Sequence, residues 1–389
     1  MPTPSALPTP VATPRLDELA RFESPLSYLG NDPVFRYLIH PFFSRGFLTP
    51  LSDSSSPLFA SGSFDVAPAP IPQSGGSKIV FSSSRDGFMQ IYAMNSDGSG
   101  QLRLTTDGSN NENPRWSPDG TKILFQCDRD NPGSGLRDIY VMNSNGSGQT
   151  RLTTDANDDC FASWSSDGTK IVFQSFRNAV SYQVYTMNAD GSSQVNISNN
   201  GVSDMQPSWS PDGTKIAFAS ERDQPGFPSI YVMNSNGTNQ TRLTFSGTGL
   251  RDEQPVWSPN GSKIAFTSTR DSTTDSWTET DDYEIPEDDG QTFPKSRLNI
   301  NKEVYLMNTD GSGQTRLTTD LSNDDSPTWS PDGVKIVFRS ERERDLFDAT
   351  PQLWTMNADG SGQTNLSNSG DSDFSPSWIS GSANQPPVA

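Results

Sequence analysis

Acidic and amide side chains recur at one place in the sequence, five residues before each of six tryptophans. The set comprises Asn111, Asp159, Asp204, Asp252, Asp324 and Asp373. We expect these residues to lie in loops that ring one mouth of a central channel, where carboxylates suit Ca²⁺. A residue needed by a single ion site has no reason to recur in every repeat. The pattern therefore favours another role, in which each side chain caps its loop by accepting bonds from backbone N–H groups.

A second charged set stands four residues after a recurring phenylalanine. It consists of Arg85, Arg129, Arg177, Arg222, Arg270 and Arg342. Strand alternation places these arginines on the same face as the acidic set, so Asp–Arg pairs within or between repeats are expected, because a guanidinium grips a carboxylate with two hydrogen bonds. The alternative is that the arginines recognise a carboxylate or phosphate of a ligand.

The elements that position both sets are short strands in a repeat that begins at Lys78. One phrase recurs as WSPDGTKILF from 116 and WSPDGTKIAF from 209, and a second, such as IYVMNSNGSGQTRLT from 139, occurs six times. Each unit reads as four strands joined by tight turns, with Pro and Gly at turn positions. The second strand is apolar on both faces, as in a sheet covered on both sides. The sequence therefore predicts an all-β, six-bladed propeller of four-stranded antiparallel blades.

The first and last units indicate how the ring closes. The first begins at Lys78 without a tryptophan strand, and the last is followed by an extra Pro376, Ser377 and Trp378. We expect this C-terminal strand to pair into the first blade as its inner strand, which removes an exposed sheet edge.

The repeats Trp-Ser-Pro-Asp-Gly-x-Lys-Ile-x-Phe and Ile-Tyr-x-Met-Asn-x-Asp-Gly resemble those of the TolB-like propeller family, over about residues 77 to 380. The resemblance implies six blades, binding of proteins, and a periplasmic or extracellular location. The same repeats also occur beside hydrolase domains. This sequence differs from TolB because it shows neither the N-terminal α/β domain nor a signal peptide.

An enzyme meets specific obstacles in this sequence. His40 is the only histidine and lies outside the repeats, so they hold neither a Ser-His-Asp triad nor a histidine-bound catalytic metal. We therefore expect a non-enzymatic protein-binding or scaffolding propeller without a cofactor. A Ca²⁺-dependent lactonase or hydrolase that uses channel carboxylates is the alternative. Cys127 and Cys160 are expected to be unpaired thiols, because they show no disulfide or metal-ligand pattern.

An insertion in the fifth repeat, from Asp271 to about Ile300, is the strongest candidate for a contact surface. It combines many carboxylates with Trp277 and Tyr283. Smaller additions occur in the same loop of other repeats, at 131–137, 224–228 and 343–351. All of them should lie on the face that carries the acidic and arginine sets, and binding residues concentrate on loops held by a rigid scaffold.

The remaining predictions follow from composition. Residues 1–75 are rich in Pro and Ser and are expected to be largely irregular, 76–380 form the propeller, and 381–389 are a tail or the start of a linker. The net charge of −19 disfavours nucleic acid as a partner. No stretch is apolar enough to span a membrane. We expect a monomer that binds a protein partner.

Overall fold

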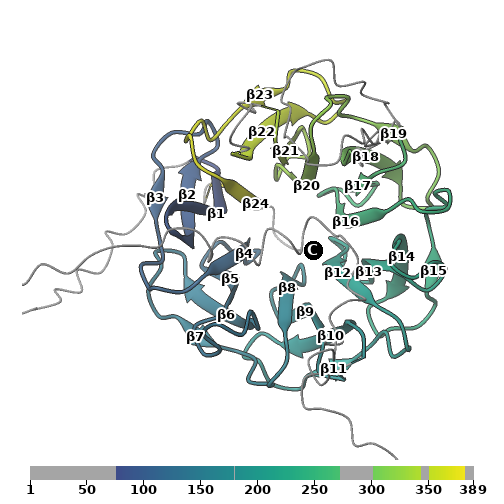
Figure 1. The fold of residues 1–389 in the computed structure, drawn as a ribbon, viewed down its shortest axis with the longest axis horizontal. Coiled ribbons are helices and arrows are strands. Elements are labelled where there is room, and N and C mark those ends of the chain that lie inside the picture. The colour runs from purple at the N-terminus through teal and green to yellow at the C-terminus, as the bar shows by residue number, and fades with distance from the viewer. Residues whose placement is uncertain (1–75, 179, 272–300, 343–349, 382–389) are drawn as a thin grey trace, which may run out of the picture. The chain divides into compact units, whose positions relative to one another are not determined.

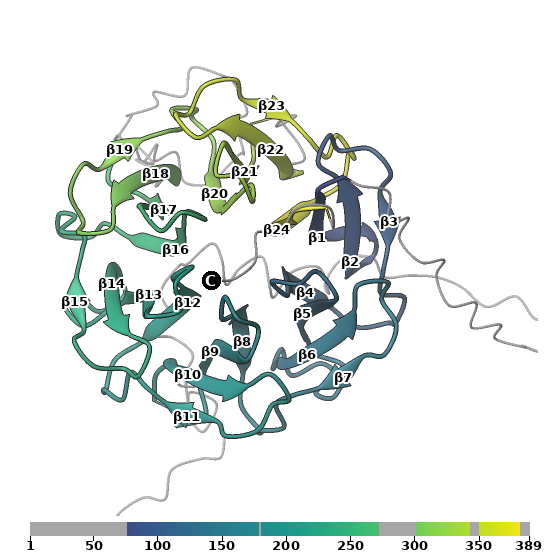
Figure 2. The ribbon, with the colours of Figure 1, turned by 180° about the vertical axis from the view of Figure 1, so that it is seen from behind.

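The chain forms a ring of six four-stranded antiparallel sheets (Figures 1 and 2), as predicted. The computed structural model describes residues 76–178, 180–271, 301–342 and 350–381. The first three blades, each from the inner to the outer strand, are β24 (Asp373–Ile379), β1 (Lys78–Asp86), β2 (Phe88–Asn95), β3 (Leu102–Arg103); β4 (Asn111–Trp116), β5 (Lys122–Cys127), β6 (Asp138–Asn143), β7 (Thr150–Arg151); β8 (Asp159–Trp164), β9 (Lys170–Ser175), β10 (Gln183–Asn188), β11 (Val195–Asn196).

Blades four to six have the same order of strands. They are β12 (Asp204–Trp209), β13 (Lys215–Ser220), β14 (Ser229–Asn234), β15 (Thr241–Arg242); β16 (Asp252–Trp257), β17 (Lys263–Ser268), β18 (Glu303–Asn308), β19 (Thr315–Arg316); β20 (Asp324–Trp329), β21 (Lys335–Ser340), β22 (Gln352–Asn357), β23 (Thr364–Asn365). The outer strand of every blade is only two residues long. A strand this short leaves little unpaired edge, which protects the rim of the ring from pairing with another chain.

The core lies between the blades, because the second strand of each blade is covered on both faces. In blade 1, Ile79, Val80 and Phe81 are all fully buried although they follow one another in β1. The tryptophan at or next to the end of an inner strand packs beside such residues, as Trp257 does with Ile264 and Phe266 in one core cluster. The continuous apolar run in the second strand, rather than an alternating one, is therefore what stacking of blades requires.

The closing strand pairs where the sequence predicts. β24 lies antiparallel to β1, with Lys78 opposite Ile379, Ile79 opposite Trp378 and Val80 opposite Ser377. In Figure 1 the C-terminal strand β24 lies inside β1, so the two ends of the repeat region share one sheet. Closure leaves β1 without an open edge.

Every inner strand contains a bulge three residues before its tryptophan. At this position the backbone adopts a positive φ of between 51° and 55° in all six blades, at Asn113, Phe161, Gln206, Gln254, Ser326 and Ser375. The register of the inner pair shifts around the bulge, as between Met205 and Ser208. Side chains of the preceding blade bind the bulged N–H groups: Gln254 N donates to Gln206 Oε1 at 3.0 Å, and Ser326 N donates to Gln254 Oε1 at 2.9 Å. The bulges therefore join neighbouring blades around the channel.

The two faces of the ring differ in regularity. On the face that carries the turns between first and second strands, the turn has the same length in blades 2 to 6, at 117–121, 165–169, 210–214, 258–262 and 330–334. On the opposite face the second and third strands are joined by Gly87 alone in blade 1, by 176–182 in blade 3 and by 269–302 in blade 5. We call these the constant face and the variable face. The variable face also holds the loops that lead from one blade to the next.

Several predictions concern residues outside the described ranges. These are the N-terminal segment 1–75 with His40, the insertion residues Trp277 and Tyr283, the loop residues 343–349, and the tail from 382 onward. They stay predictions.

Candidate functional site

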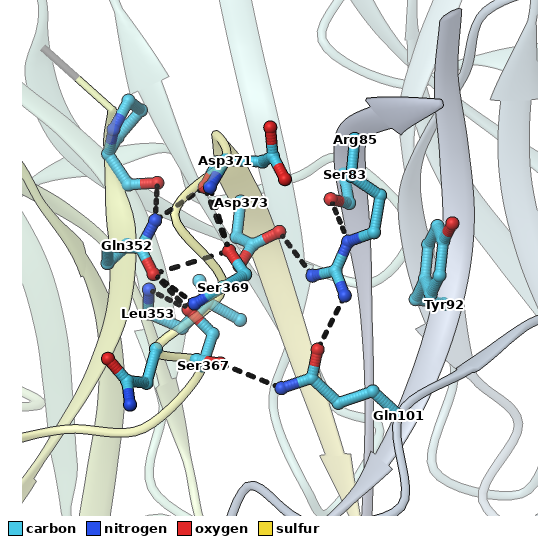
Figure 3. Close-up of polar contacts among 12 residues, drawn as sticks. Ser83, Arg85, Tyr92, Gln101, Gln352, Leu353, Ser367, Ser369, Asp371 and Asp373 are labelled. Carbon is cyan, nitrogen blue, oxygen red and sulfur yellow. Dashed lines mark hydrogen bonds and ion pairs between the residues drawn. The ribbon is translucent and has the colours of Figure 1, made fainter. Parts of the chain in front are cut away.

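Arg85 shows how the repeated arginines are used (Figure 3). Its Nη2 forms an ion pair with Asp373 Oδ1 at 3.0 Å, its Nε donates to Ser83 Oγ at 2.8 Å, and its Nη1 donates to Gln101 Oε1 at 2.6 Å. The guanidinium carbon also lies 4.5 Å from the centre of the Tyr92 ring. One arginine thus joins the inner, second and third strands of blade 1 and the hairpin before its outer strand.

The same ion pair recurs in four other blades. The nitrogen–oxygen distances are 2.7 Å for Arg177–Asp159, 3.1 Å for Arg222–Asp204, 2.8 Å for Arg270–Asp252 and 2.6 Å for Arg342–Asp324. Blade 2 has an amide instead, so Arg129 donates to Asn111 Oδ1 at 2.9 Å and takes its charge partner from Asp107, at 2.8 Å. Each pair lies within one blade and ties its first two strands together.

The acidic set is placed differently from the prediction. Its members are the first residues of the inner strands rather than loop residues, and all six side chains are buried. In blades 2 to 6 each stands opposite the last residue of the second strand, as Asp204 does opposite Ser220, and in blade 1 Asp373 stands opposite Ser83. The side chains are therefore buried within the ring rather than exposed at the channel mouth. The carboxylate oxygens of this set accept hydrogen bonds from arginines and from side-chain donors such as Asn200 and Ser369. The predicted role, in which each carboxylate caps its loop by accepting from backbone N–H groups, is therefore wrong.

Burial decides the charge state of two of these carboxyls. Burial raises the pKa of Asp159 to about 6, although Arg177 and Ser175 act in the opposite direction. The pKa of Asp324 is also raised to about 6 by burial, against the effect of Arg342. Within the described ranges, no three His, Cys, Asp or Glu side chains are grouped so that they could hold a metal ion. The acidic and arginine sets therefore stabilise the blades by pairing with each other. A ligand-binding role for the two sets stays a prediction.

The channel encloses a cavity of about 300 Å³ between the inner strands. Its lining includes Trp164, Trp209, Gln254 and Phe161, together with one charged side chain, Arg115. Sequence reasoning missed Arg115. The available signal was its departure from the repeat, because the corresponding residue of every other blade is small and uncharged.

The variable face carries most of the exposed large apolar side chains. Among the described residues these are Phe88, Val180, Phe227, Phe245 and Leu321, all in or beside its loops. Phe245 is 73% exposed and Leu321 is 68% exposed. The constant face contributes Val334, and Val195 lies on an outer strand. Both predicted free cysteines, Cys127 and Cys160, are buried and unpaired.

The sequence and the fold both resemble those of known propeller proteins. Residues 61–180, 177–282 and 288–384 match the TolB beta propeller domain. The chain belongs to this family. Among solved structures, TolB from Acinetobacter baumannii is 21% identical, with a TM-score of 0.58 over 79% of this chain and 67% of that chain. TolB from Agrobacterium tumefaciens is 23% identical, with a TM-score of 0.53 over 75% of this chain and 89% of that chain.

The TolB beta-propeller fold also occurs in a protein of another kind. Hydrazine synthase from Kuenenia stuttgartiensis is 15% identical, with a TM-score of 0.58 over 81% of this chain and 48% of that chain. No curated protein matches the sequence. Within the part of the chain that the structure describes, no helix has the length and apolar character needed to cross a membrane. One fold serves several functions, so the fold alone does not identify the function of this chain.

Proposed function

We propose that this chain is a non-enzymatic, protein-binding propeller that contacts its partner through the variable face. The observation that carries the proposal is the coincidence of two features on that face, the loops of unequal length and the exposed apolar side chains. Regular blades with one irregular face are what a scaffold needs when its loops bind. Exposed aromatic and aliphatic residues within a polar surface are typical of interaction sites.

The pattern of charges supports the same reading. Loop carboxylates of the variable face are largely used internally, as Asp86 is by Arg103 at 3.1 Å and Asp223 by Arg242 at 3.1 Å. Arg242 also lies 4.7 Å from the centre of the Phe245 ring, a cation–π contact that favours the outward position of this aromatic. An exposed phenylalanine restrained in this way loses less conformational entropy on binding, which favours a role as an anchor.

The structure gives no specific support to the alternative of a Ca²⁺-dependent enzyme. The carboxylates on which a Ca²⁺-dependent hydrolase would depend are buried against arginines. We infer that their role is structural. The resemblance to TolB supports a location in the bacterial periplasm or outside the cell. We propose a monomer whose partner is another protein rather than nucleic acid.

A pair of matched double variants tests the face assignment. Phe245→Ser with Leu321→Ser removes two exposed apolar side chains from the variable face, and Val195→Ser with Val334→Ser removes two elsewhere. Tagged proteins capture partners from a bacterial envelope extract, and the affinity of the enriched protein is then measured by titration calorimetry. We expect the first variant to lose at least tenfold in affinity, because truncating an interface anchor costs roughly 1–3 kcal/mol.

The control variant should bind like the unmodified chain, and both variants should melt within about 2 °C of it, since the altered side chains are exposed. Equal loss in both variants, or full binding by both, contradicts the assignment of the variable face. Deleting residues 271–300 then asks whether the insertion with Trp277 and Tyr283 adds to that contact.

A further inference from the structure

Arg115 breaks the sixfold pattern of the channel. It stands in β4 directly before Trp116 and lines the central cavity. The corresponding residues of the other blades are Ser163, Ser208, Val256, Thr328 and Ser377. A side chain that serves the fold recurs in every blade, as the Asp–Arg pairs do, whereas a side chain that occurs once has a local cause.

Arg115 has no carboxylate partner among the residues that the structure describes. Every other arginine in the described ranges forms an ion pair, among them the deeply buried Arg137 with Asp158 at 2.7 Å and Arg339 with Asp325 at 2.8 Å. Arg115 uses only Nη1, which donates to backbone carbonyls, with Pro114 O at 2.9 Å and Ser375 O at 3.3 Å. Within the described part of the chain, its Nε and Nη2 donate to no acceptor.

The missing partner matters because Arg115 is half-buried and lines the channel cavity. Burial lowers the pKa of Arg115 to about 10, so the side chain remains a cation at neutral pH. A cation in a partly dry cavity is costly unless an anion pairs with it. An anion that entered the cavity would therefore meet a cation that has no charge partner among the described residues.

A second departure from the repeat lies in the neighbouring blade. Phe161 occupies the bulge of β8 with a φ of 53°, where the other blades have Asn, Gln or Ser. The positive φ recurs in every blade, but it is unfavourable for a bulky side chain, so a phenylalanine at this position is a departure that the repeat does not require. Phe161 is only partly buried and lines the same cavity as Arg115. Arg115 and Phe161 thus depart from the repeat on one side of a wall that is otherwise built mainly from serine, threonine, proline, amide and tryptophan side chains.

We propose that the central cavity binds a small organic carboxylate, with the carboxylate paired to Arg115 and the apolar part of the molecule in contact with Phe161. A planar guanidinium fork matches a carboxylate with two parallel bonds. A single cation balances a monoanion, whereas a phosphate dianion would leave excess negative charge in a chain of net charge −19. The cavity of about 300 Å³ has room for a ring, since a cavity of roughly 150 Å³ admits benzene. This site is separate from the variable face.

Arg115 also has a structural alternative, because its carbonyl partner Ser375 belongs to the closing strand β24. In that case the arginine only stabilises the closure of the ring. A purely structural role predicts a lower melting temperature for Arg115→Ser and no binding of a carboxylate by the unmodified chain or by any variant. The two readings therefore differ in ligand dependence rather than in stability.

The test uses 4-fluorobenzoate as the probe and 4-fluorobenzamide as its uncharged match, followed by ¹⁹F line broadening and titration calorimetry on the full chain. We expect binding of the benzoate and at least tenfold weaker binding of the benzamide, because bonds between two charged groups are the strong ones. Arg115→Ser should lower the affinity for 4-fluorobenzoate by about tenfold to a hundredfold. Phe161→Gln introduces the residue found at this position in blades 4 and 5. It should lower the affinity for 4-fluorobenzoate several-fold and leave the affinity for acetate unchanged.

Lys215→Ser is the control for net charge, since it removes one exposed cation on the constant face, and should bind like the unmodified chain. If Arg115→Ser does not fold, Arg115→Lys keeps the charge but not the fork, and should bind the benzoate several-fold more weakly than the unmodified chain. Binding that is equal in the unmodified chain and the Arg115 variants, or no binding of the benzoate at millimolar concentration, overturns the proposal. Tighter binding of inorganic phosphate than of benzoate overturns the assignment to a carboxylate.

Discussion

Exchanging the charge partner of Arg85 tests whether the arginine–carboxylate ion pairs of different blades are interchangeable. Asp373→Asn in blade 1 copies Asn111 of blade 2 but leaves Arg85 without a carboxylate, because Ser369 stands where blade 2 has Asp107. Adding Ser369→Asp restores the missing charge in the place that blade 2 uses. Ser369 and Asp373 are already joined at 2.7 Å, as Asp107 and Asn111 are at 2.9 Å (Figure 3).

The magnitude follows from the distance and the burial. At 3.0 Å and an effective dielectric constant of about 20, the Arg85–Asp373 attraction is about 5.5 kcal/mol. The asparagine still accepts one hydrogen bond and no longer has to be desolvated as a charge, which together offset roughly half of the attraction. We expect Asp373→Asn to lower the free energy of unfolding by about 2–3 kcal/mol, or the melting temperature by about 3–8 °C.

The double variant should regain most of that loss. Ser369→Asp alone places a second carboxylate beside Asp373 and should destabilise by about 1 kcal/mol. The two changes should therefore couple favourably by at least 2 kcal/mol in a double-mutant cycle. The assay is urea unfolding followed by tryptophan fluorescence, with Asp204→Asn as a reference in a blade that lacks an acidic residue at the Ser369 position. Additive effects would refute the equivalence of the blades.

Three further predictions follow from single sites. Gly237→Ala should destabilise by about 2–4 kcal/mol in the same assay, because φ is +87° and a Cβ would overlap the carbonyl oxygen of Ile197 in the preceding blade; Gly201→Ala, with open space around it, should be neutral. The pKa of Asp324 is about 6 in the folded chain against 3.8 as its ordinary value, so its stabilising contribution, about 3 kcal/mol, is complete below pH 4 and lost as the pH rises through 6. Asp324→Asn should remove that dependence, and a carboxyl ¹³C titration with a midpoint near 4 would contradict it. Burial raises the pKa of Cys127 to about 11, so native protein should not react with a thiol reagent at pH 8, and two thiols should appear in urea; a disulfide would give none.

The repeats predict the fold and its closure because repetition makes residues equivalent. Once Trp378 is recognised as the counterpart of Trp116, its strand has only one vacant place to fill. The same equivalence brings Arg85 to Asp373 across almost the whole sequence. Predictions of this kind need no knowledge of the local conformation.

Local conformation is where the sequence is insufficient. The positive φ of Phe161, Gln206 and Ser326 carries no glycine or asparagine signal, because neighbouring blades fix it through bonds such as that from Ser326 N to Gln254. The sequence predicts loop positions for the acidic set because residue type alone does not show where a short strand begins. That no carboxylate of the described residues pairs with Arg115 depends on how the blades pack around the channel, and the sequence does not show this packing.

The closing pair of strands has a consequence for synthesis on the ribosome. Ile379 pairs with Lys78, so roughly 300 residues must be added after β1 has emerged before its partner exists. At about 5–20 residues per second this takes about 15–60 s, during which the edge of β1 is unpaired. Blades 2 to 6 each contain their four strands in one continuous stretch and have no such delay. A translation product released before residue 373 would keep five complete blades and one open edge, the surface through which β-rich proteins aggregate.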